Sequence, residues 1–258
     1  MFATLSRLSS EGFRIFFFAA AAYGLLVGLT WLVWVGALAQ GLLLDLPGPA
    51  MLPQQWHAHE MIFGYALAAV GGFFLTAVPN WTASPGARHG FVLAVAGLWL
   101  LGRVAVWASG GLNPVLVMAL DQLFIPVLAG KILTQLIKRP KPQNMVFLGF
   151  LSALWVANLL VHLDWIGWAD TLDHGLRMGL LALVGMIAVL GGRVTPAFTR
   201  NAMKRAGAGD EASWPRSPGQ LNKLVMLTAL ALPWAALWMP LAGALALLLA
   251  LAQAGRQW

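Results

Sequence analysis

Only 10% of the 258 residues are charged and 60% are hydrophobic, which excludes a soluble domain, where about 25% charged residues are usual. The formal net charge of +7 does not indicate nucleic-acid binding, because the basic residues lie between apolar runs, where they orient membrane helices. The chain has no cysteine, so disulfides, thiolate metal sites, iron–sulfur clusters and cysteine-attached haem are excluded.

Apolar stretches follow one another along the whole chain. Most approach the roughly 20 residues that an α-helix needs to cross a bilayer, and proline residues mark several of the junctions. The pattern predicts an all-α polytopic bundle of about eight transmembrane helices surrounded by lipid. The predicted spans are 14–43, 57–78, 89–109, 114–137, 144–163, 173–195, 221–238 and 241–254.

The charges of the loops predict the orientation of these spans, because an excess of Lys and Arg marks the cytoplasmic side. The loop 138–142 and the segment 193–223 are basic, whereas the loop 164–173 contains three aspartates and neither Lys nor Arg. Eight spans then place the N-terminus in the cytoplasm. They also make residues 196–220 a cytoplasmic basic loop.

The sequence Trp-His-Ala-His-Glu at residues 56–60 puts ionisable side chains at the outer end of the second span. His57 and Glu60 are three residues apart and can share one helical face, whereas His59 points about 200° away from His57. A regular helix therefore does not easily bring both histidines to one metal ion. Unless the first turn of the helix is distorted, we expect one of two arrangements. Either the two histidines bind two different centres, or one binds the metal and the other hydrogen-bonds to a ligand.

The predicted topology brings further polar residues into the same leaflet. Arg103 and Arg177 lie within apolar spans, where a buried charge costs at least a few kcal/mol and needs a partner. Asp121 is a candidate partner for either arginine, and an anionic ligand is another. We interpret the following residues as a cofactor-binding set, with the first two as metal ligands: His57, His59, Glu60, Arg103, His162, His174 and Arg177.

Neutral imidazoles in a cysteine-free membrane protein suit copper or haem b. Guanidinium groups would bind haem propionates bidentately. The motif is not the His-Glu-x-x-His of zinc peptidases, because Phe63 occupies the position of the second histidine. The sequence contains no nucleophile–His set and no phosphate-binding loop, so it leaves open whether the protein is an enzyme.

A second motif, LGGRVTPAFTRNAMKR, occupies residues 190–205. Its two adjacent glycines allow close backbone approach, and Pro196 predicts the end of the helix or a kink. Two interpretations remain: a basic helix end that sets topology, or an inner site for an anion or a partner. The residues concerned are Arg193, Thr199, Arg200 and Asn201.

Four segments together resemble the NnrS family: WHAHEMIFGY at 56–65, FLTAVPNWT at 74–82, GRVAV at 102–106 and GGRVTPAFTRNAM at 191–203. The resemblance implies a multi-pass protein of the bacterial inner membrane that acts in the nitric oxide response and contains haem and copper. It also implies that residues 57, 59 and 60 belong to the family's histidine-rich motif and that residues 193–201 belong to its second signature. It assigns no individual ligand.

The resemblance further implies about twelve spans, with more histidines toward the C-terminus. Residues 1–258 would then be a single transmembrane domain, either the N-terminal two-thirds of a longer, truncated protein or an unusually short member of the family. We expect a haem- and copper-binding membrane protein of the response to nitric oxide and nitrosative stress, with nitric oxide as a ligand. The alternatives are a transporter or metal- or haem-handling permease without redox chemistry, and a structural subunit that docks a cytoplasmic partner.

Overall fold

The computed structural model describes residues 7–42, 44, 48–210 and 219–255. The regular structure of these residues is helical and contains no strand, which confirms the all-α fold class. Six helical segments are long and apolar enough to cross a membrane: Gly12–Ala39, Pro53–Thr82, Gly90–Trp107, Pro114–Leu136, Pro142–Trp165 and Leu172–Ala206. The first five coincide within about four residues with the first five predicted spans, and the sixth begins as predicted but extends beyond residue 195 to Ala206. The chain is therefore a multi-pass membrane protein.

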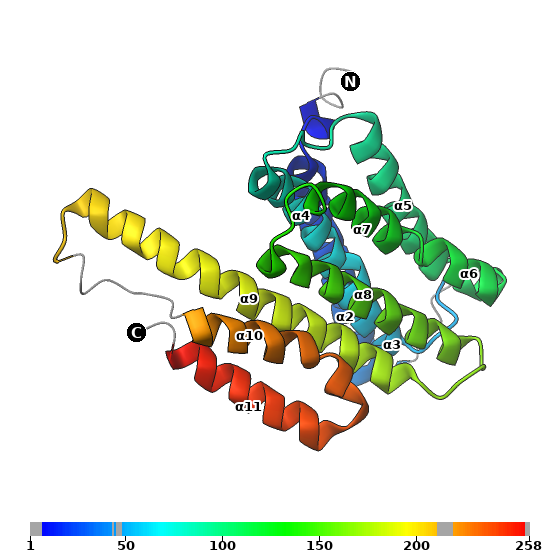
Figure 1. Cartoon of the computed structure of the whole chain (residues 1–258). Helices are drawn as coiled ribbons and strands as arrows, with labels where there is room; N and C mark the ends of the chain where they lie inside the picture. Colours follow the sequence, from blue (N-terminus) through cyan, green and yellow to red (C-terminus); the bar gives the residue numbers. More distant parts are fainter. Residues whose placement is uncertain (1–6, 43, 45–47, 211–218, 256–258) are drawn as a thin grey trace. The chain divides into compact units, whose positions relative to one another are not determined.

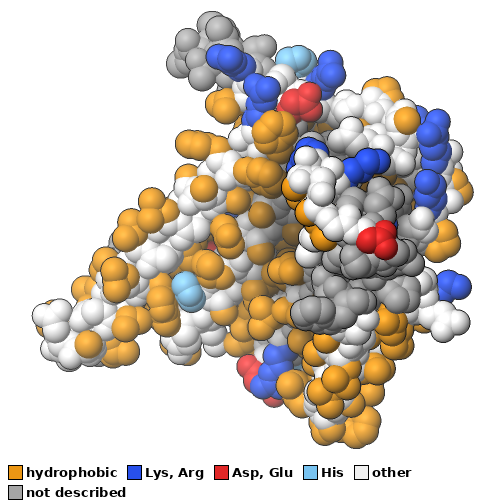
Figure 2. Space-filling view, turned by 90° about the vertical axis from the view of Figure 1, so that its left-hand side faces the viewer, with side chains coloured by type: hydrophobic (Ala, Val, Ile, Leu, Met, Phe, Trp, Pro, Cys, Tyr) orange, Lys and Arg blue, Asp and Glu red, His pale blue; other side chains and the backbone are white. Residues whose placement is uncertain are grey.

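The first compact unit comprises residues Met1–Leu176. Its helices, shown in Figure 1, are α2 (Gly12–Ala39), α3 (Pro53–His59), α4 (Leu67–Thr82), α5 (Gly90–Trp107), α6 (Pro114–Asp121), α7 (Phe124–Leu136) and α8 (Pro142–Trp165). Long apolar side chains of α2 are solvent-exposed, for example Phe18 at 68% and Leu32 at 66%, as expected for a helix that contacts lipid. Figure 2 shows hydrophobic side chains over broad areas of the surface.

Two of the six spans are interrupted. The second span contains a π-helical segment, η1 (Glu60–Ala66), between α3 and α4. The fourth span is broken at Gln122 and Leu123, between α6 and α7. Pro126 explains this break, because proline has no N–H to donate to the carbonyl of Gln122 four residues earlier. Both interruptions lie beside ionisable residues, Glu60 in one span and Asp121 in the other.

Helices α2 and α4 pack closely because α4 presents glycines to α2. A Cβ atom on Gly72 would lie 2.9 Å from Cβ of Phe16, and a Cβ on Gly71 would lie 2.9 Å from the ring of Phe124 in α7. Phe16 is fully buried at this contact. The close approach fixes the second span against the first and so positions the His-Ala-His-Glu segment at the N-terminal end of that span.

The second compact unit comprises residues Arg177–Trp258. It contains most of α9 (Leu172–Ala206), α10 (Gly219–Ala231) and α11 (Met239–Gly255). Gln253 of α11 donates a hydrogen bond to the carbonyl of Ala188 in α9. The last two predicted spans fall on α10 and α11, which have 13 and 17 residues and are shorter than the roughly 20 that span a bilayer.

Helix α9 runs through Pro196 and ends at Ala206, so the helix does not end at this proline. Part of the predicted cytoplasmic loop 196–220 is therefore helical, and its residues 211–218 lie outside the described part of the chain.

Candidate metal centre

Seven polar side chains from five of the six spans meet inside the first unit, and we call them the buried polar cluster. Six of them are at most 4% exposed, and the seventh, Tyr23, reaches the cluster from α2. The members are Tyr23, His59, Glu60, Arg103, Asp121, Asn158 and His162. Such a set within transmembrane helices is expensive to bury and indicates a functional site.

Local features of each helix place these side chains. His59 ends α3 and Glu60 begins the π-helical turn η1, which rotates both residues relative to α4. Both residues reach the cluster although they are adjacent in sequence, and Nδ1 of His59 lies 2.9 Å from Oε1 of Glu60. Asn158 and His162 are four residues apart and share one face of α8.

Glycines make room for the two carboxylates. A Cβ atom on Gly64 would lie 2.7 Å from Oε2 of Glu60, and a Cβ on Gly102 would lie 2.6 Å from Oδ1 of Asp121. These separations are below any normal van der Waals contact. The glycines therefore allow the carboxylates to approach the backbones of η1 and α5.

Arg103 bridges the two carboxylates. Its Nη1 donates to Oε2 of Glu60 at 2.7 Å, and its Nη2 donates to Oδ1 of Asp121. The hydroxyl of Tyr23 donates to the same Oε2 of Glu60. Asp121 is thus the partner of Arg103, one of the two candidates that the sequence left open. Both terminal nitrogens of this guanidinium already bind carboxylates of the protein, so they are not free to bind a haem propionate bidentately.

Both ring nitrogens of His59 face hydrogen-bond acceptors. Nδ1 lies 2.9 Å from Oε1 of Glu60, and Nε2 lies 2.8 Å from Oδ1 of Asn158 and 3.4 Å from Oδ2 of Asp121. The orientation of the Asn158 amide follows from its Nδ2, which donates to Asp121 at 2.9 Å. In a neutral imidazole whose proton is on Nδ1, the Nε2 lone pair would face two oxygens. A cation at Nε2, either a proton or a metal ion, removes this repulsion.

His162 completes a set of metal-ligand type. Its Nε2 lies 2.9 Å from the same oxygen of Asp121 that His59 approaches. One ligand atom each from His59, Asp121 and His162 lies within 4.8 Å of the others. Bonds of about 2.0–2.1 Å around a tetrahedral ion place neighbouring ligand atoms about 3.3 Å apart. The Nε2 atoms of His59 and His162 lie 3.4 and 2.9 Å from Oδ2 of Asp121.

The charges of the cluster also favour a cation. Glu60 and Asp121 each bring one negative charge, and Arg103 brings one positive charge. With both histidines neutral, the buried cluster keeps one uncompensated negative charge. An isolated buried charge is strongly unfavourable, so a metal ion or a proton is required at this place.

A haem does not fit between these histidines. The Nε2 atoms of His59 and His162 approach one carboxylate oxygen, and their ring centroids are 5.6 Å apart with a T-shaped arrangement. The rings of Phe63 and Trp165 also pack against His59, at 5.0 and 4.9 Å. A porphyrin would have to displace these contacts. The buried polar cluster therefore suits a single ion.

The two remaining predicted histidines of the first unit are not part of the buried polar cluster. His57 is half-buried outside the cluster, stacks on Trp31 with centroids 4.6 Å apart, and has a buried Nδ1 without a partner. His174, in the first turn of α9, is half-buried and is not among the hydrogen-bond partners of the cluster. Arg177 belongs to the second unit, as do the residues of the second motif, Arg193, Thr199, Arg200 and Asn201, all on α9.

Tyr23 and Asn158 were not predicted from the sequence. Asn158 had a signal: it is a carboxamide within an apolar run, four residues before His162. Tyr23 is one of only two tyrosines in the chain, and nothing local distinguishes it from the aromatic side chains that contact lipid.

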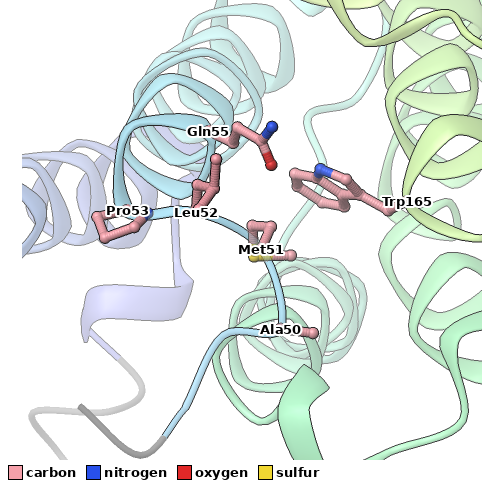
Figure 3. A pocket seen from close by; sticks show the side chains of 6 residues that line it. All are labelled: Ala50, Met51, Leu52, Pro53, Gln55 and Trp165. Carbon is pink, nitrogen blue, oxygen red and sulfur yellow. The ribbon is translucent and has the colours of Figure 1, made fainter. Parts of the chain in front are cut away.

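A cavity of about 320 Å³ lies next to the buried polar cluster at the start of α3. Figure 3 shows the side chain of Gln55 pointing toward the ring of Trp165 across the cavity, with Met51 below both. The ring of Trp165 separates this cavity from His59 and His162, at centroid distances of 4.9 and 5.3 Å. Nε1 of Trp165 is buried without a partner.

Comparison with known proteins agrees with the motifs. Neither a curated protein nor a solved structure matches the chain. The family model described as NnrS protein matches residues 7–258, which includes every helix described above. The chain therefore belongs to the NnrS family.

Proposed function

We propose that this chain is a metal-binding membrane protein of the nitric oxide response that holds one copper ion between His59, Asp121 and His162. The observation that carries the proposal is the environment of Nε2 of His59, which faces two oxygens inside a cluster with one excess negative charge. Two imidazoles and a carboxylate suit several transition metals, among which copper is bound most tightly in its divalent form and neutralises the cluster fully in its monovalent form. Family membership supports copper among them.

The neighbouring residues have distinct roles in this proposal. Glu60 accepts the Nδ1 proton of His59, which fixes the tautomer and turns Nε2 toward the ion. Asn158 and Arg103 orient Asp121, so that one oxygen binds the guanidinium and the other faces the histidines. Trp165 and Phe63 exclude water from His59.

A bound copper ion would supply a coordination position for nitric oxide and the capacity for one-electron exchange. The protein would contribute ligands that aromatic rings shield from water and that hydrogen bonds hold in place. The haem that the family resemblance implies does not fit at the buried polar cluster, and the proposal does not use it. The proposed location is the bacterial inner membrane, with the N-terminus in the cytoplasm.

The test is metal analysis of the full-length protein, purified from cells supplied with copper. We expect about one copper per chain by mass spectrometry, reduced by His59→Ala and by His162→Ala. The matched controls are His57→Ala and His174→Ala, because these histidines lie outside the buried polar cluster. Optical and paramagnetic resonance spectra should change when nitric oxide is added to the parent. A folded, metal-free parent, or equal loss in the control variants, would refute the proposal.

A second candidate function is a permease that moves a cation without redox chemistry. It is favoured by the two interrupted spans, because broken helices at the depth of the membrane line substrate paths in transporters. Copper uptake into proteoliposomes separates the two functions. If copper is a permanent constituent of the protein, about one ion per chain should stay bound and no copper should enter the vesicles. If the protein is a permease, copper should enter the vesicles and Asp121→Asn should abolish this flux.

A further inference from the structure

The proposed ligands in the buried polar cluster are closed off from solvent. His59, Asp121 and His162 are at most 3% exposed, so an ion enters or leaves only when a neighbouring side chain moves. Two aromatic rings pack on His59, and they differ in burial: Phe63 is 1% exposed, whereas Trp165 is only half-buried. Trp165 also packs edge-on against His162, with ring centroids 5.3 Å apart. Of the two covers, Trp165 therefore lies nearer the surface.

Trp165 also lines the cavity of about 320 Å³ at the start of α3 (Figure 3). This cavity lies where α3 begins and α8 ends, and these points are ends of the second and fifth spans. The ends of a span meet the aqueous phase, whereas its middle meets hydrocarbon. The cavity therefore opens toward water, and the amide of Gln55 contributes to its wall. One indole ring separates this space from two of the proposed ligands.

The backbone on both sides of the cavity is held by hydrogen bonds, whereas the indole is not. On one side, the N–H of Ala50 donates to Oγ of Ser109 at 2.8 Å. On the other side, the N–H of Thr171 donates to Oδ2 of Asp164 at 2.9 Å, next to Trp165 at the end of α8. Nε1 of Trp165 has no hydrogen-bond partner among the described residues. The Trp165 side chain is therefore the part that can move without breaking a hydrogen bond, and rotations of side chains are fast.

We propose that the cavity at the start of α3 is the entrance through which a cation reaches the buried polar cluster, and that the Trp165 indole is its gate. In the closed position the ring keeps water from His59 and His162. Rotation of the indole away from these histidines joins the cavity to the proposed ligands. The inference rests on the proposed cation site, but it does not depend on which metal the site holds.

The experiment uses Ag⁺ as the probe, because it is a small cation that reacts with thiols. The chain has no cysteine, so His162→Cys places a single thiol behind Trp165. The full chain with this substitution is held in lipid nanodiscs and exposed to Ag⁺ for increasing times, and the remaining thiol is counted by maleimide labelling in denaturant. Adding Trp165→Ala should remove the gate and raise the reaction rate at least about tenfold. Adding Gln55→Trp should fill the cavity and lower the rate at least about tenfold.

The matched controls are Trp168→Ala and Gln54→Trp in the same His162→Cys chain. Trp168 is 65% exposed, Gln54 is the exposed neighbour of Gln55, and neither lines the cavity. Both controls should react at the rate of the chain that carries His162→Cys alone. An unchanged rate with Gln55→Trp overturns the entrance, and an unchanged rate with Trp165→Ala overturns the gate. Gln55→Trp decides the matter alone if Trp165→Ala does not fold.

Copper content of the chain with His162 intact separates this inference from the proposed function. A folded, metal-free chain refutes the copper centre, and the Ag⁺ rates still decide whether the entrance exists. A chain with about one copper, whose His162→Cys form reacts with Ag⁺ at a rate that neither Trp165→Ala nor Gln55→Trp changes, refutes the entrance alone.

Discussion

Arg103→Met removes the only charge that compensates Glu60 and Asp121 among the described partners of the buried polar cluster. Methionine has a similar length and no charge, so the variant leaves two buried carboxylates instead of a cavity. Removing one partner of a buried ion pair costs about 3–5 kcal/mol, because the other charge stays buried. For a chain of this size each kcal/mol lowers the melting temperature by about 2–4 °C. We therefore expect a decrease of about 10 °C.

The assay is thermal unfolding of the purified protein, followed by tryptophan fluorescence. Arg139→Met is the control, because Arg139 is an exposed basic residue at the end of the fourth span. Adding Glu60→Gln and Asp121→Asn to Arg103→Met removes the uncompensated charges and should recover most of the lost stability. If Arg103→Met melts within about 2 °C of the parent, or the triple variant melts lower still, the bridging role of the guanidinium is refuted.

Three further predictions concern the centre, the packing and the orientation. Asn158→Leu should reduce copper affinity about 10- to 100-fold in a competition titration, because it removes a hydrogen bond that orients Asp121. Gly102→Ala should destabilise the protein in thermal unfolding, since its Cβ would meet an aspartate oxygen at 2.6 Å, whereas Gly97→Ala, which meets nothing within 4 Å, should be neutral or stabilising. The chain has no cysteine, so Ala169→Cys should react with an impermeant maleimide in intact cells, whereas Lys138→Cys should react only after lysis.

Hydropathy and proline positions were sufficient to predict the first six helical segments. Apolar runs of 18 residues or more have few alternatives in a cysteine-free chain with 10% charged residues. The last two spans were harder to predict, because α10 and α11 are apolar but short. A helix of 13 to 17 residues has the composition of a span without its length, and composition alone does not distinguish the two.

The composition of the site was less predictable than the fold. His59, Glu60, Arg103, Asp121 and His162 were expected because ionisable groups in apolar spans are costly wherever they occur. Their common place in one leaflet was expected as well, but the helical wheel paired His57 with Glu60, whereas the structure places His59 beside Glu60 and leaves His57 outside the cluster. The π-helical turn that begins at Glu60 rotates α3 relative to α4, and no residue type marks such a turn in advance.

The two interruptions in the helices and the buried polar cluster have a common physical basis. A π-helical turn and a broken span each leave backbone groups with weaker hydrogen bonds, which is unfavourable in a membrane. Both occur next to a buried carboxylate, Glu60 in η1 and Asp121 at the end of α6. A regular α-helix at either place would turn one carboxylate away from Arg103 and leave an unpaired charge. The energetic cost of the distorted backbone is thus smaller than the cost that it avoids, so the interruptions follow from the requirement for a compensated cluster.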